Sequence, residues 1–274
     1  MSQPELPLES HGRLALITGA SAGIGECFAR TLAARGCDLV LVARRADRLE
    51  ALATELRDAY AVEITVLPAD LAVLGAAESV LASVREGGRE VEILVNNAGF
   101  SIPQSFAAVP WSKQQDFLMT LVVNACGLAH GVIPAMLARG QGRIINVASL
   151  AGFAPGVAGH TLYPGAKSLM IKFTQGLDAE YRAAGLKITA VCPGFTQTEF
   201  AAANGTAAVM DKAPRRLFQT PVQVVNAALK GNDRGRVVVI PGWHNVVAAI
   251  VLQHFPQSLV RAALMKGSAK YHLD

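Results

Sequence analysis

Short apolar runs alternate with amphipathic stretches along most of the 274-residue chain. Seven runs of strand length are almost continuously apolar, at residues 14–18, 39–43, 64–67, 93–95, 143–147, 188–191 and 237–240. Such strands are buried on both faces, as in a parallel sheet covered by helices. Helical patterns lie between them at residues 23–34, 46–60, 75–85, 112–138, 162–184 and 222–230. We therefore predict one α/β domain over residues 1–274, a doubly wound and mostly parallel seven-stranded sheet with helices on both faces.

An apolar extension at about residues 241–274 follows the last predicted strand. A helix predicted over residues 244–255 is apolar on every side from Val246 to Leu252, so we expect it to be buried or to face lipid. Pro256 ends this helix, and a second one is predicted over residues 257–266. We expect this tail to form part of a lid or a contact with another subunit. Contact with a membrane surface is less favoured, because the tail carries few basic residues.

Composition excludes several classes of protein. Hydrophobic residues make up 51% of the chain and charged residues 17%, which is not the composition of a disordered chain. The net charge is only +4 and the basic residues are scattered, so we expect no nucleic-acid partner. The four cysteines and six histidines form no ligand motif, and we predict no metal site. We found neither a signal peptide nor an uncharged apolar run of ~20 residues, and we predict a cytoplasmic protein with reduced thiols.

A glycine-rich turn over residues 18–25, with the sequence TGASAGIG, joins the first predicted strand to the first helix. Glycine lets the backbone turn tightly and approach a pyrophosphate, and the start of a helix favours an anion. The alternative is an ordinary strand-to-helix turn. The strand before it and the helix after it favour dinucleotide binding. The candidate contacts in this turn are Gly19, Ser21, Gly23, Ile24 and Gly25.

Further motifs follow in order along the chain. They are NNAG at residues 96–99, Asn124 in the long helix, Ser149 after the fifth strand, YPGAK at residues 163–167 and PGFTQT at residues 193–198. With the spacing of the glycine-rich turn, these motifs resemble the short-chain dehydrogenase/reductase family over roughly residues 12–240. The resemblance implies a Rossmann-type domain that transfers a hydride between a nicotinamide and a carbonyl or carbinol carbon.

The resemblance also implies a catalytic set. Tyr163 would donate the proton in reduction, Lys167 would hold the nicotinamide ribose, Ser149 would stabilise the developing alkoxide, and Asn124 would hold a water connected to Lys167. From the residues alone, Tyr163 and Lys167 share one helix face, and an ammonium lowers the pKa of a nearby phenol. The alternatives are an ordinary turn serine at Ser149 and a hydrogen-bonded core amide at Asn124.

The remaining cofactor contacts are also implied by the resemblance. They are Asp70, Leu71, Asn97, Ala98, Gly99, Tyr163, Lys167, Pro193, Gly194, Thr196 and Thr198. At the end of the second strand, Ala43 stands where a carboxylate that selects NAD is expected, and Arg44 and Arg45 follow. Because a guanidinium fits a phosphate well, we predict a preference for NADP(H) over NAD(H). The alternatives are solvent-facing arginines and an Asp70 that caps the following helix.

The substrate site is expected in three segments beyond the strand ends, at residues 100–107, 152–160 and 195–219. Their large apolar residues are Phe100, Ile102, Phe106, Phe153, Phe195, Phe200, Met210, Leu217 and Phe218. We predict an NADP-dependent enzyme acting on a small-molecule ketone or secondary alcohol that is bulky and apolar; His160 is a further candidate for the lining.

Other readings of the function stay open. The basic residues Lys212, Arg215 and Arg216 leave a 3-oxoacyl thioester reductase as the alternative, and a non-catalytic dinucleotide-binding regulator is the least favoured function. The two long predicted helices have apolar faces. In the family the matching helices pair across a two-fold axis, so the resemblance implies a homodimer or homotetramer.

Overall fold

The computed structural model of the protein describes residues 12–156, 158–200, 204 and 214–268. Its centre is a seven-stranded sheet in the order β3-β2-β1-β4-β5-β6-β7, with every neighbouring pair parallel. The strands are β1 (Leu14–Thr18), β2 (Asp38–Ala43), β3 (Ile64–Pro68), β4 (Ile93–Asn96), β5 (Gly142–Val147), β6 (Leu186–Val191) and β7 (Val238–Val239). This confirms the predicted Rossmann-type α/β fold; β7 is shorter than the run at residues 237–240 suggested.

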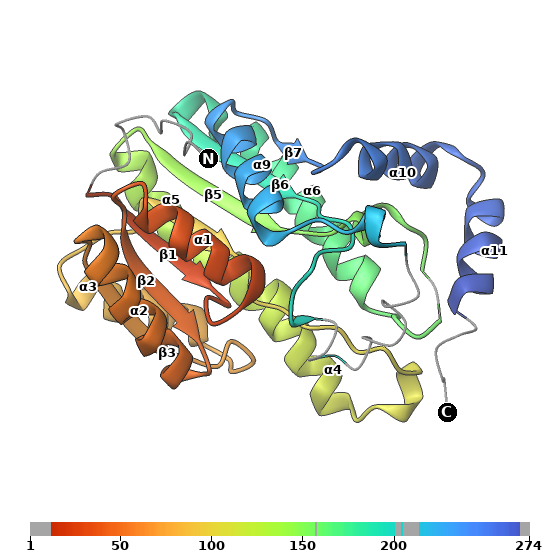
Figure 1. The fold of residues 1–274 in the computed structure, drawn as a ribbon, viewed down its shortest axis with the longest axis horizontal. Helices are drawn as coiled ribbons and strands as arrows, with labels where there is room; N and C mark the ends of the chain where they lie inside the picture. The colour runs from red at the N-terminus through yellow and green to blue at the C-terminus, as the bar shows by residue number, and fades with distance from the viewer. Residues whose placement is uncertain (1–11, 157, 201–203, 205–213, 269–274) are drawn as a thin grey trace.

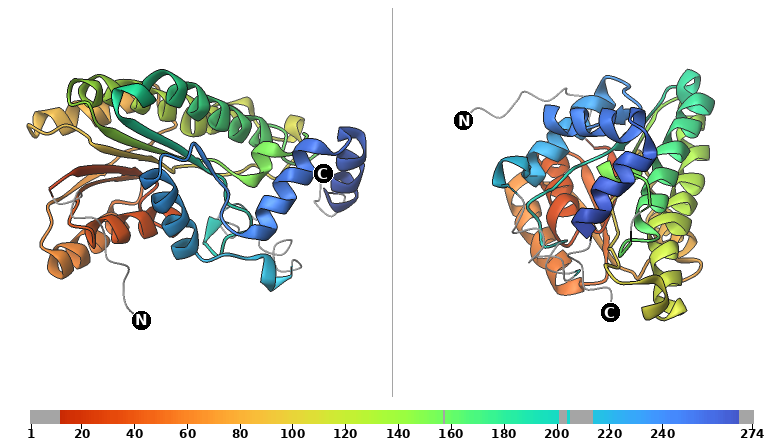
Figure 2. Two further views of the ribbon diagram at one scale, coloured as in Figure 1. Left: turned by 90° about the horizontal axis from the view of Figure 1, so that it is seen from above. Right: turned by 90° about the vertical axis from the view of Figure 1, so that its right-hand side faces the viewer.

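Helices cover both faces of the sheet (Figures 1 and 2). One face carries α1 (Gly23–Ala33), α2 (Ala46–Tyr60) and α9 (Pro221–Asp233), and the other carries α3 (Ala76–Glu86), α5 (Asn124–Ala138) and α6 (Tyr163–Tyr181). Alternate residues of each central strand enter the two cores. Ala15 and Ile17 belong to the first core, and Leu14 and Leu16 belong to the second. Burial on both faces is why these strands read as continuous apolar runs.

The helix predicted over residues 112–138 is divided by a change of winding. It consists of α4 (Trp111–Leu118), a π-helical turn (Met119–Val123) and α5, which begins at Asn124. Such π turns occur frequently at functional sites.

The same helical stretch shows that one expectation about apolar runs was wrong. Trp111–Ala138 has a mean hydropathy of 1.7 and is long and apolar enough to cross a membrane by composition alone. Leu128, Ala129 and Val132 are buried against the sheet, so this apolar face belongs to the core of the chain.

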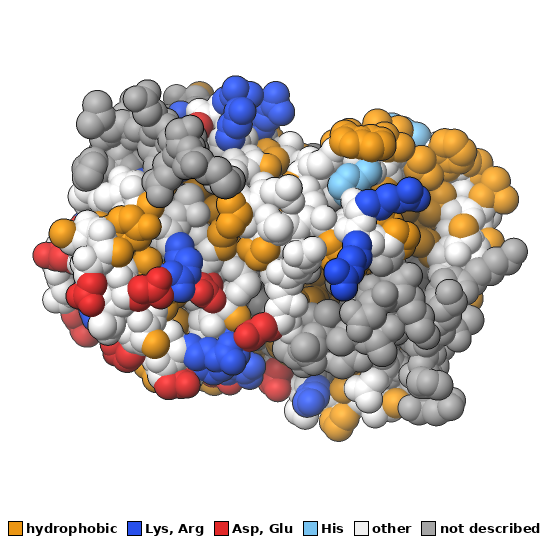
Figure 3. Space-filling model, viewed as in Figure 1, with side chains coloured by type: hydrophobic (Ala, Val, Ile, Leu, Met, Phe, Trp, Pro, Cys, Tyr) orange, Lys and Arg blue, Asp and Glu red, His pale blue; other side chains and the backbone are white. Residues whose placement is uncertain are grey.

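The tail forms α10 (Trp243–His254) and α11 (Gln257–Ser268), which project from one end of the sheet (Figure 1). Within this chain only Asn245 and Ala249 of the first tail helix are buried, so the chain itself does not cover the helix on every side. Its exposed large apolar side chains gather with those of α11 at one end of the molecule (Figure 3). These exposed residues are Trp243, Val246, Val247, Ile250, Val251, Phe255, Leu259 and Met265.

Candidate active site

The glycine-rich turn is built so that only glycine fits at its critical positions. Gly19 and Gly23 have φ of +66° and +59°, which side chains other than glycine rarely adopt. A Cβ on Gly25 would lie 2.2 Å from the carbonyl oxygen of Gly19, so α1 packs directly on the turn. Ile24 is partly buried against the adjacent core. The turn therefore presents bare backbone and the start of α1 to a ligand, which suits a pyrophosphate.

Asn97, directly after β4, holds this turn in place. Its Nδ2 donates to the carbonyl oxygens of Thr18 at 2.9 Å and Gly19 at 3.3 Å. In return, the hydroxyl of Thr18 accepts from the backbone N–H groups of Asn97 and Ala98. Gly99 follows against the side chain of Leu121, where a Cβ would come within 3.2 Å. The NNAG motif thus supports the glycine-rich turn from the neighbouring strand.

The two arginines after β2 have different surroundings. Arg45 donates from Nη2 and Nε to the hydroxyl of Ser21, at 2.9 and 3.2 Å, and lies 3.5 Å from Glu199. Arg44 is far more open, with its side chain 72% exposed and its closest carboxylate contact at 4.0 Å from Asp70. Arg45 is therefore engaged with the glycine-rich turn, while Arg44 presents an accessible guanidinium at the end of β2.

Asp70 does not cap the helix that follows it, so that alternative is wrong. Its Oδ1 accepts from the backbone N–H of Ala72 at 3.0 Å, while α3 begins at Ala76 after Gly75. The carboxylate therefore closes a local turn next to Arg44.

Tyr163, Lys167 and Ser149 come together at the carboxyl end of β5. Tyr163 is the first residue of α6, and Lys167 lies one turn later with Nζ 5.7 Å from the centre of the Tyr163 ring. Pro164 is tolerated in this first turn because its missing N–H has no helical partner there. Ser149 has a hydrogen bond with Tyr163 and accepts from the N–H of Ala151 at 3.1 Å. The predicted trio is thus assembled in the structure.

The electrostatics of the trio differ from the sequence prediction. Burial raises the pKa of Tyr163, and the hydrogen bond to Ser149 only partly opposes this shift. Lys167 donates to the carbonyl oxygen of Val147 at 2.8 Å, and burial lowers its pKa to about 8. The expected lowering of the Tyr163 pKa by the ammonium is therefore wrong for this arrangement. Tyr163 is protonated at neutral pH, which is the form that a reduction needs.

The side chain of Asn124 is hydrogen-bonded at both of its polar atoms to backbone groups. Its Oδ1 accepts from the N–H of Ala77 at 2.9 Å, and its Nδ2 donates to the carbonyl oxygens of Leu71 and Val73 at 2.9 and 3.0 Å. The carboxamide is therefore a satisfied core amide, as the alternative had it. It ties the start of α5 to the turn before α3 and to Leu71, which is buried.

A small cavity connects Lys167 to the π-helical turn. Its polar lining is Thr18, Asn96, Thr120 and Lys167.

The segment that follows β6 crosses the whole site. The carbonyl oxygen of Pro193 accepts from the N–H of Leu150, the residue after Ser149, at 2.8 Å. At its other end, Thr198 lies against the glycine-rich turn, where a Cβ on Gly23 would come within 3.1 Å of its methyl group. Between them, the hydroxyl of Thr196 donates to the carbonyl oxygen of Gly194 at 3.2 Å. The cofactor contacts expected at residues 193–198 therefore line one continuous path.

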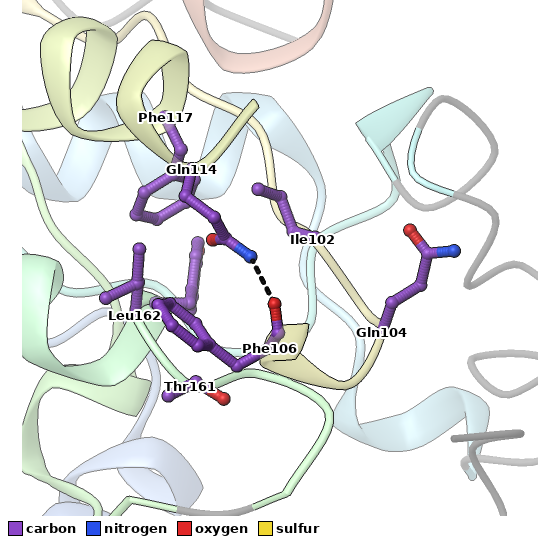
Figure 4. Close-up of a pocket in the computed structure, with 8 residues that line it drawn as sticks. Ile102, Gln104, Phe106, Gln114, Phe117, Thr161 and Leu162 are labelled. Atoms are coloured by element: carbon purple, nitrogen blue, oxygen red, sulfur yellow. Dashed lines mark hydrogen bonds between the residues drawn. The ribbon is translucent and has the colours of Figure 1, made fainter. Parts of the chain in front are cut away.

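Aromatic rings lie around Tyr163. The rings of Phe117, Phe200 and His160 each lie 6.4 Å from the ring of Tyr163, and burial lowers the pKa of His160. Phe100 packs edge-on against Phe117 at 5.6 Å. A pocket opens beside these rings (Figure 4), lined by Ile102, Gln104, Phe106, Gln114, Phe117, Thr161, Leu162 and Tyr163.

The pocket contains residues that the sequence did not single out. Phe117 and Gln114 come from α4, which reads as an ordinary amphipathic helix, so no local signal marks them. Gln114 is buried and donates to the carbonyl oxygen of Phe106 at 3.4 Å. Of the predicted lining, Phe195 stacks on Phe218 at 5.5 Å, while Met210 and Lys212 lie outside the described residues.

Comparisons with known proteins agree with this arrangement. Residues 13–208 match the short chain dehydrogenase family. The very-long-chain 3-oxoacyl-CoA reductase of Anas platyrhynchos is 35% identical over 226 residues, which are 80% of this chain and 68% of that protein.

Two solved structures are similar over nearly the whole chain. A short-chain dehydrogenase from Sphingobium yanoikuyae in complex with NADPH has a TM-score of 0.79 and 35% identity, and covers 93% of this chain and 95% of its own. The bulky-bulky ketone specific alcohol dehydrogenase from Comamonas testosteroni has a TM-score of 0.75 and 32% identity, over 93% and 94%.

The chain belongs to the short-chain dehydrogenase/reductase family. It is an oxidoreductase with a Rossmann fold, of a family that binds a nicotinamide dinucleotide and acts on small molecules.

Proposed function

We propose that the protein is an NADP(H)-dependent carbonyl reductase and secondary-alcohol dehydrogenase for bulky, apolar ketones. The observation that carries this proposal is the aromatic and aliphatic lining directly beside Tyr163, formed by Phe117, Phe200, Ile102 and Leu162. Apolar walls of this kind favour an apolar substrate, since burying such a surface is the main source of its binding free energy. The similarity to the alcohol dehydrogenase from Comamonas testosteroni, named for bulky-bulky ketones, supports this substrate class.

The residues present fit a dinucleotide. The bare backbone of Gly19 and Gly25 suits the pyrophosphate. Both positions require glycine, because a Cβ on Gly25 would collide with Gly19 and one on Gly19 would collide with Asn97 and Ala98. When bound, the nicotinamide supplies or accepts the hydride. Tyr163, protonated at neutral pH, donates a proton to the carbonyl oxygen in reduction. Ser149 orients that oxygen and stabilises its developing charge, and the Lys167 ammonium adds a positive charge nearby.

A preference for NADP(H) is part of the proposal. Arg44 supports it, because its exposed guanidinium stands at the end of β2, where the 2′-phosphate of NADP lies in a dinucleotide site. Ala43 at the strand end carries no carboxylate to bind a 2′-hydroxyl instead. The presence of NADPH in the similar Sphingobium structure agrees with this preference.

A 3-oxoacyl thioester is the second candidate substrate. Arg215 and Arg216 are exposed in the short helix at Arg215–Leu217, within the predicted substrate segments. Two cations at that place suit the phosphates of a coenzyme A or an acyl carrier. The similarity to the Anas 3-oxoacyl-CoA reductase supports this candidate.

A panel of substrates tests both candidates. Oxidation of NADPH and NADH would be followed with a bulky diaryl ketone, a small aliphatic ketone and a 3-oxoacyl-CoA, and the alcohols would be tested in the reverse direction. We expect the largest kcat/KM with NADPH and the bulky ketone. A larger kcat/KM for the thioester would select the second candidate. No turnover with any carbonyl compound, despite cofactor binding, would select the non-catalytic regulator.

We further propose a cytoplasmic homodimer or homotetramer. The thiols of Cys27, Cys126 and Cys192 form no disulfide, which supports a reducing compartment. An association of subunits is supported by the exposed apolar side chains of the tail helices. Further exposed apolar residues are Val123 in the π-helical turn, Leu137 on α5 and Leu169 on α6.

A further inference from the structure

A buried pair of amides lies where the tail meets the body of the protein. Asn245 is the third residue of α10 and is only 5% exposed. Its Nδ2 donates to the side-chain oxygen of Gln219 at 2.9 Å and to the carbonyl oxygen of Pro241 at 2.8 Å. Gln219 is also buried. Neither side chain belongs to the catalytic set, so the pair needs another explanation than chemistry on the substrate.

The carboxamide of Asn245 rests directly on Gly194. A Cβ on that glycine would lie 2.4 Å from Oδ1 of Asn245 and 2.8 Å from its Nδ2. Gly194 therefore has to be glycine for the α10 side chain to reach this position. Gly194 belongs to the segment that runs from the catalytic serine to the glycine-rich turn.

The backbone of Gln219 is hydrogen-bonded to the same segment. Its N–H donates to the carbonyl oxygen of Phe195 at 2.9 Å, and its carbonyl oxygen accepts from the N–H of Gln197 at 2.9 Å. Thr196 and Gln219 form an isolated parallel bridge. Residues 194–197 are thus held by the backbone of Gln219 and by the side chain of Asn245, which are hydrogen-bonded to each other.

Both partners are anchored at the beginnings of helices. Gln219 directly precedes the capping box of α9, in which Thr220 and Gln223 exchange two hydrogen bonds. On the other side, Gly242 has a φ of +81°, and a Cβ there would lie 2.8 Å from Nε2 of Gln219. The pair is therefore fixed from both sides, which makes it a rigid support rather than a loose contact.

We propose that Asn245 is a positioning residue for the nicotinamide cofactor. Through Gln219 and Gly194 it holds residues 194–197 in the conformation that binds the nicotinamide half. The cofactor then binds without first having to order this segment, which lowers the entropic cost of binding. Because such coupling is reciprocal, bound cofactor stabilises the start of α10. The inference rests on the proposed cofactor-binding function and extends it to the tail.

Direct binding of NADPH, followed by its fluorescence, tests the proposal. We expect Asn245→Ala to raise the Kd about tenfold, the scale of one buried hydrogen-bonding group. Asn245→Asp should do the same, since a carboxylate cannot donate to Gln219 or Pro241. At saturating cofactor, kcat of the Asn245 variants should stay within about twofold of wild type, so the defect is in binding.

Gln253→Ala is the matched control. Gln253 lies in the same helix, but among the described residues its amide donates to Ala249 of that helix, at 3.2 Å, and not to the segment after β6. If Gln253→Ala weakened NADPH binding as much as Asn245→Ala, the effect would come from α10 in general and the inference would be wrong. Equal Kd values for the wild type and both Asn245 variants would also overturn it. Failure of the wild type itself to bind NADPH or NADH would instead overturn the proposed function.

A measurement on the wild type covers the case in which a variant fails to fold. Addition of NADPH should slow amide hydrogen exchange at residues 241–247, as well as in the glycine-rich turn. Slower exchange in the turn with unchanged exchange at residues 241–247 would show that the tail is not coupled to the cofactor, and would overturn the inference.

Discussion

The guanidinium of Arg45 donates two hydrogen bonds to the hydroxyl of Ser21, and this fixes the loop after β2 against the glycine-rich turn. The preceding residue, Arg44, is left as the accessible cation at the strand end, with 72% of its side chain exposed. Two adjacent arginines thus have separate roles, one in the support of the turn and one in the proposed recognition of a 2′-phosphate.

Replacement of Arg44 should therefore change the choice of cofactor. We expect the wild type to prefer NADPH in kcat/KM, and Arg44→Ala to narrow its preference over NADH by about 1.5–3 kcal/mol, the scale of a charged hydrogen bond. Arg48→Ala is the control, because Arg48 is paired with Glu199 at 2.7 Å. Its loss should leave the ratio of kcat/KM for NADPH to kcat/KM for NADH unchanged. A wild type that uses NADH as well as NADPH would contradict the prediction.

Removal of the Tyr163 hydroxyl should abolish turnover. Tyr163→Phe keeps the ring that packs against Phe117 and Phe200 but has no proton to donate. We expect kcat to fall about a thousandfold or more, with an almost unchanged Kd for NADPH. Tyr181→Phe, at the other end of α6, should have wild-type kinetics. Retention of more than about a tenth of the activity would show that Tyr163 is not the proton donor.

The rate of ketone reduction should fall at alkaline pH. Burial lowers the pKa of Lys167 to about 8, while the pKa of Tyr163 is raised above its ordinary value. As the pH increases through about 8, Lys167 loses its charge while Tyr163 still carries its proton. We expect kcat/KM for reduction, whose pH profile reports the groups of the free enzyme, to be level below pH 7 and to decline above pH 8. A decline that begins only near pH 10 would assign the titration to another group.

The same shift predicts how stability depends on pH. The pKa of Lys167 is about 8 in the folded protein and near 10.5 in the unfolded chain. Between these values the unfolded chain binds the extra proton, so the contribution of Lys167 to stability rises with pH. The total change is on the order of 3 kcal/mol. Relative to Lys167→Met, which has no such titration, the wild type should gain stability by this amount between pH 8 and 10.5 in urea unfolding. If the difference in unfolding free energy between the wild type and Lys167→Met did not change with pH, the shift in the pKa of Lys167 would be contradicted.

The sequence predicted the local motifs of the fold better than the contacts within the site. The turn at Gly19 and Gly25 was readable, because its glycines, the strand before it and the helix after it are neighbours in the chain. The partners of Asn124 were not readable, because Leu71 and Ala77 are brought to it only by the packing of α3 against α5. The raised pKa of Tyr163 was missed for the same reason: it comes from the burial of the side chain by segments far apart in the chain, which no local pattern shows.

The aromatic rings around Tyr163 should decide which ketones are accepted. Phe200 is 39% exposed and its ring lies 6.4 Å from Tyr163, so it can contact a substrate without being needed for folding. We expect Phe200→Ala to raise KM for a diaryl ketone several-fold while KM for a small aliphatic ketone stays the same, because only the larger substrate reaches the ring. Phe255→Ala, an exposed phenylalanine on the tail, is the control. Equal changes for both ketones would place the substrate elsewhere.

The exposed face of α10 should be needed for assembly. Val247 and Ile250 are 52% and 51% exposed and lie on the face opposite Ala249, which is buried. An apolar stripe of this kind is covered in a stable oligomer, and a carboxylate on it would remain unpaired at the contact.

We therefore expect Val247→Asp and Ile250→Asp to lower the mass measured by light scattering at micromolar concentration, with an unchanged Kd for NADPH because Asn245 is intact. Gln253→Glu adds the same charge at a position of α10 that is already polar and should leave the mass unaltered. A wild type that is already a monomer would refute the oligomer. A loss of liposome binding in the Asp variants, at unchanged mass, would assign the stripe to a membrane surface instead. If the variants kept the mass, and also bound liposomes as the wild type does, α10 would not be an interface of either kind.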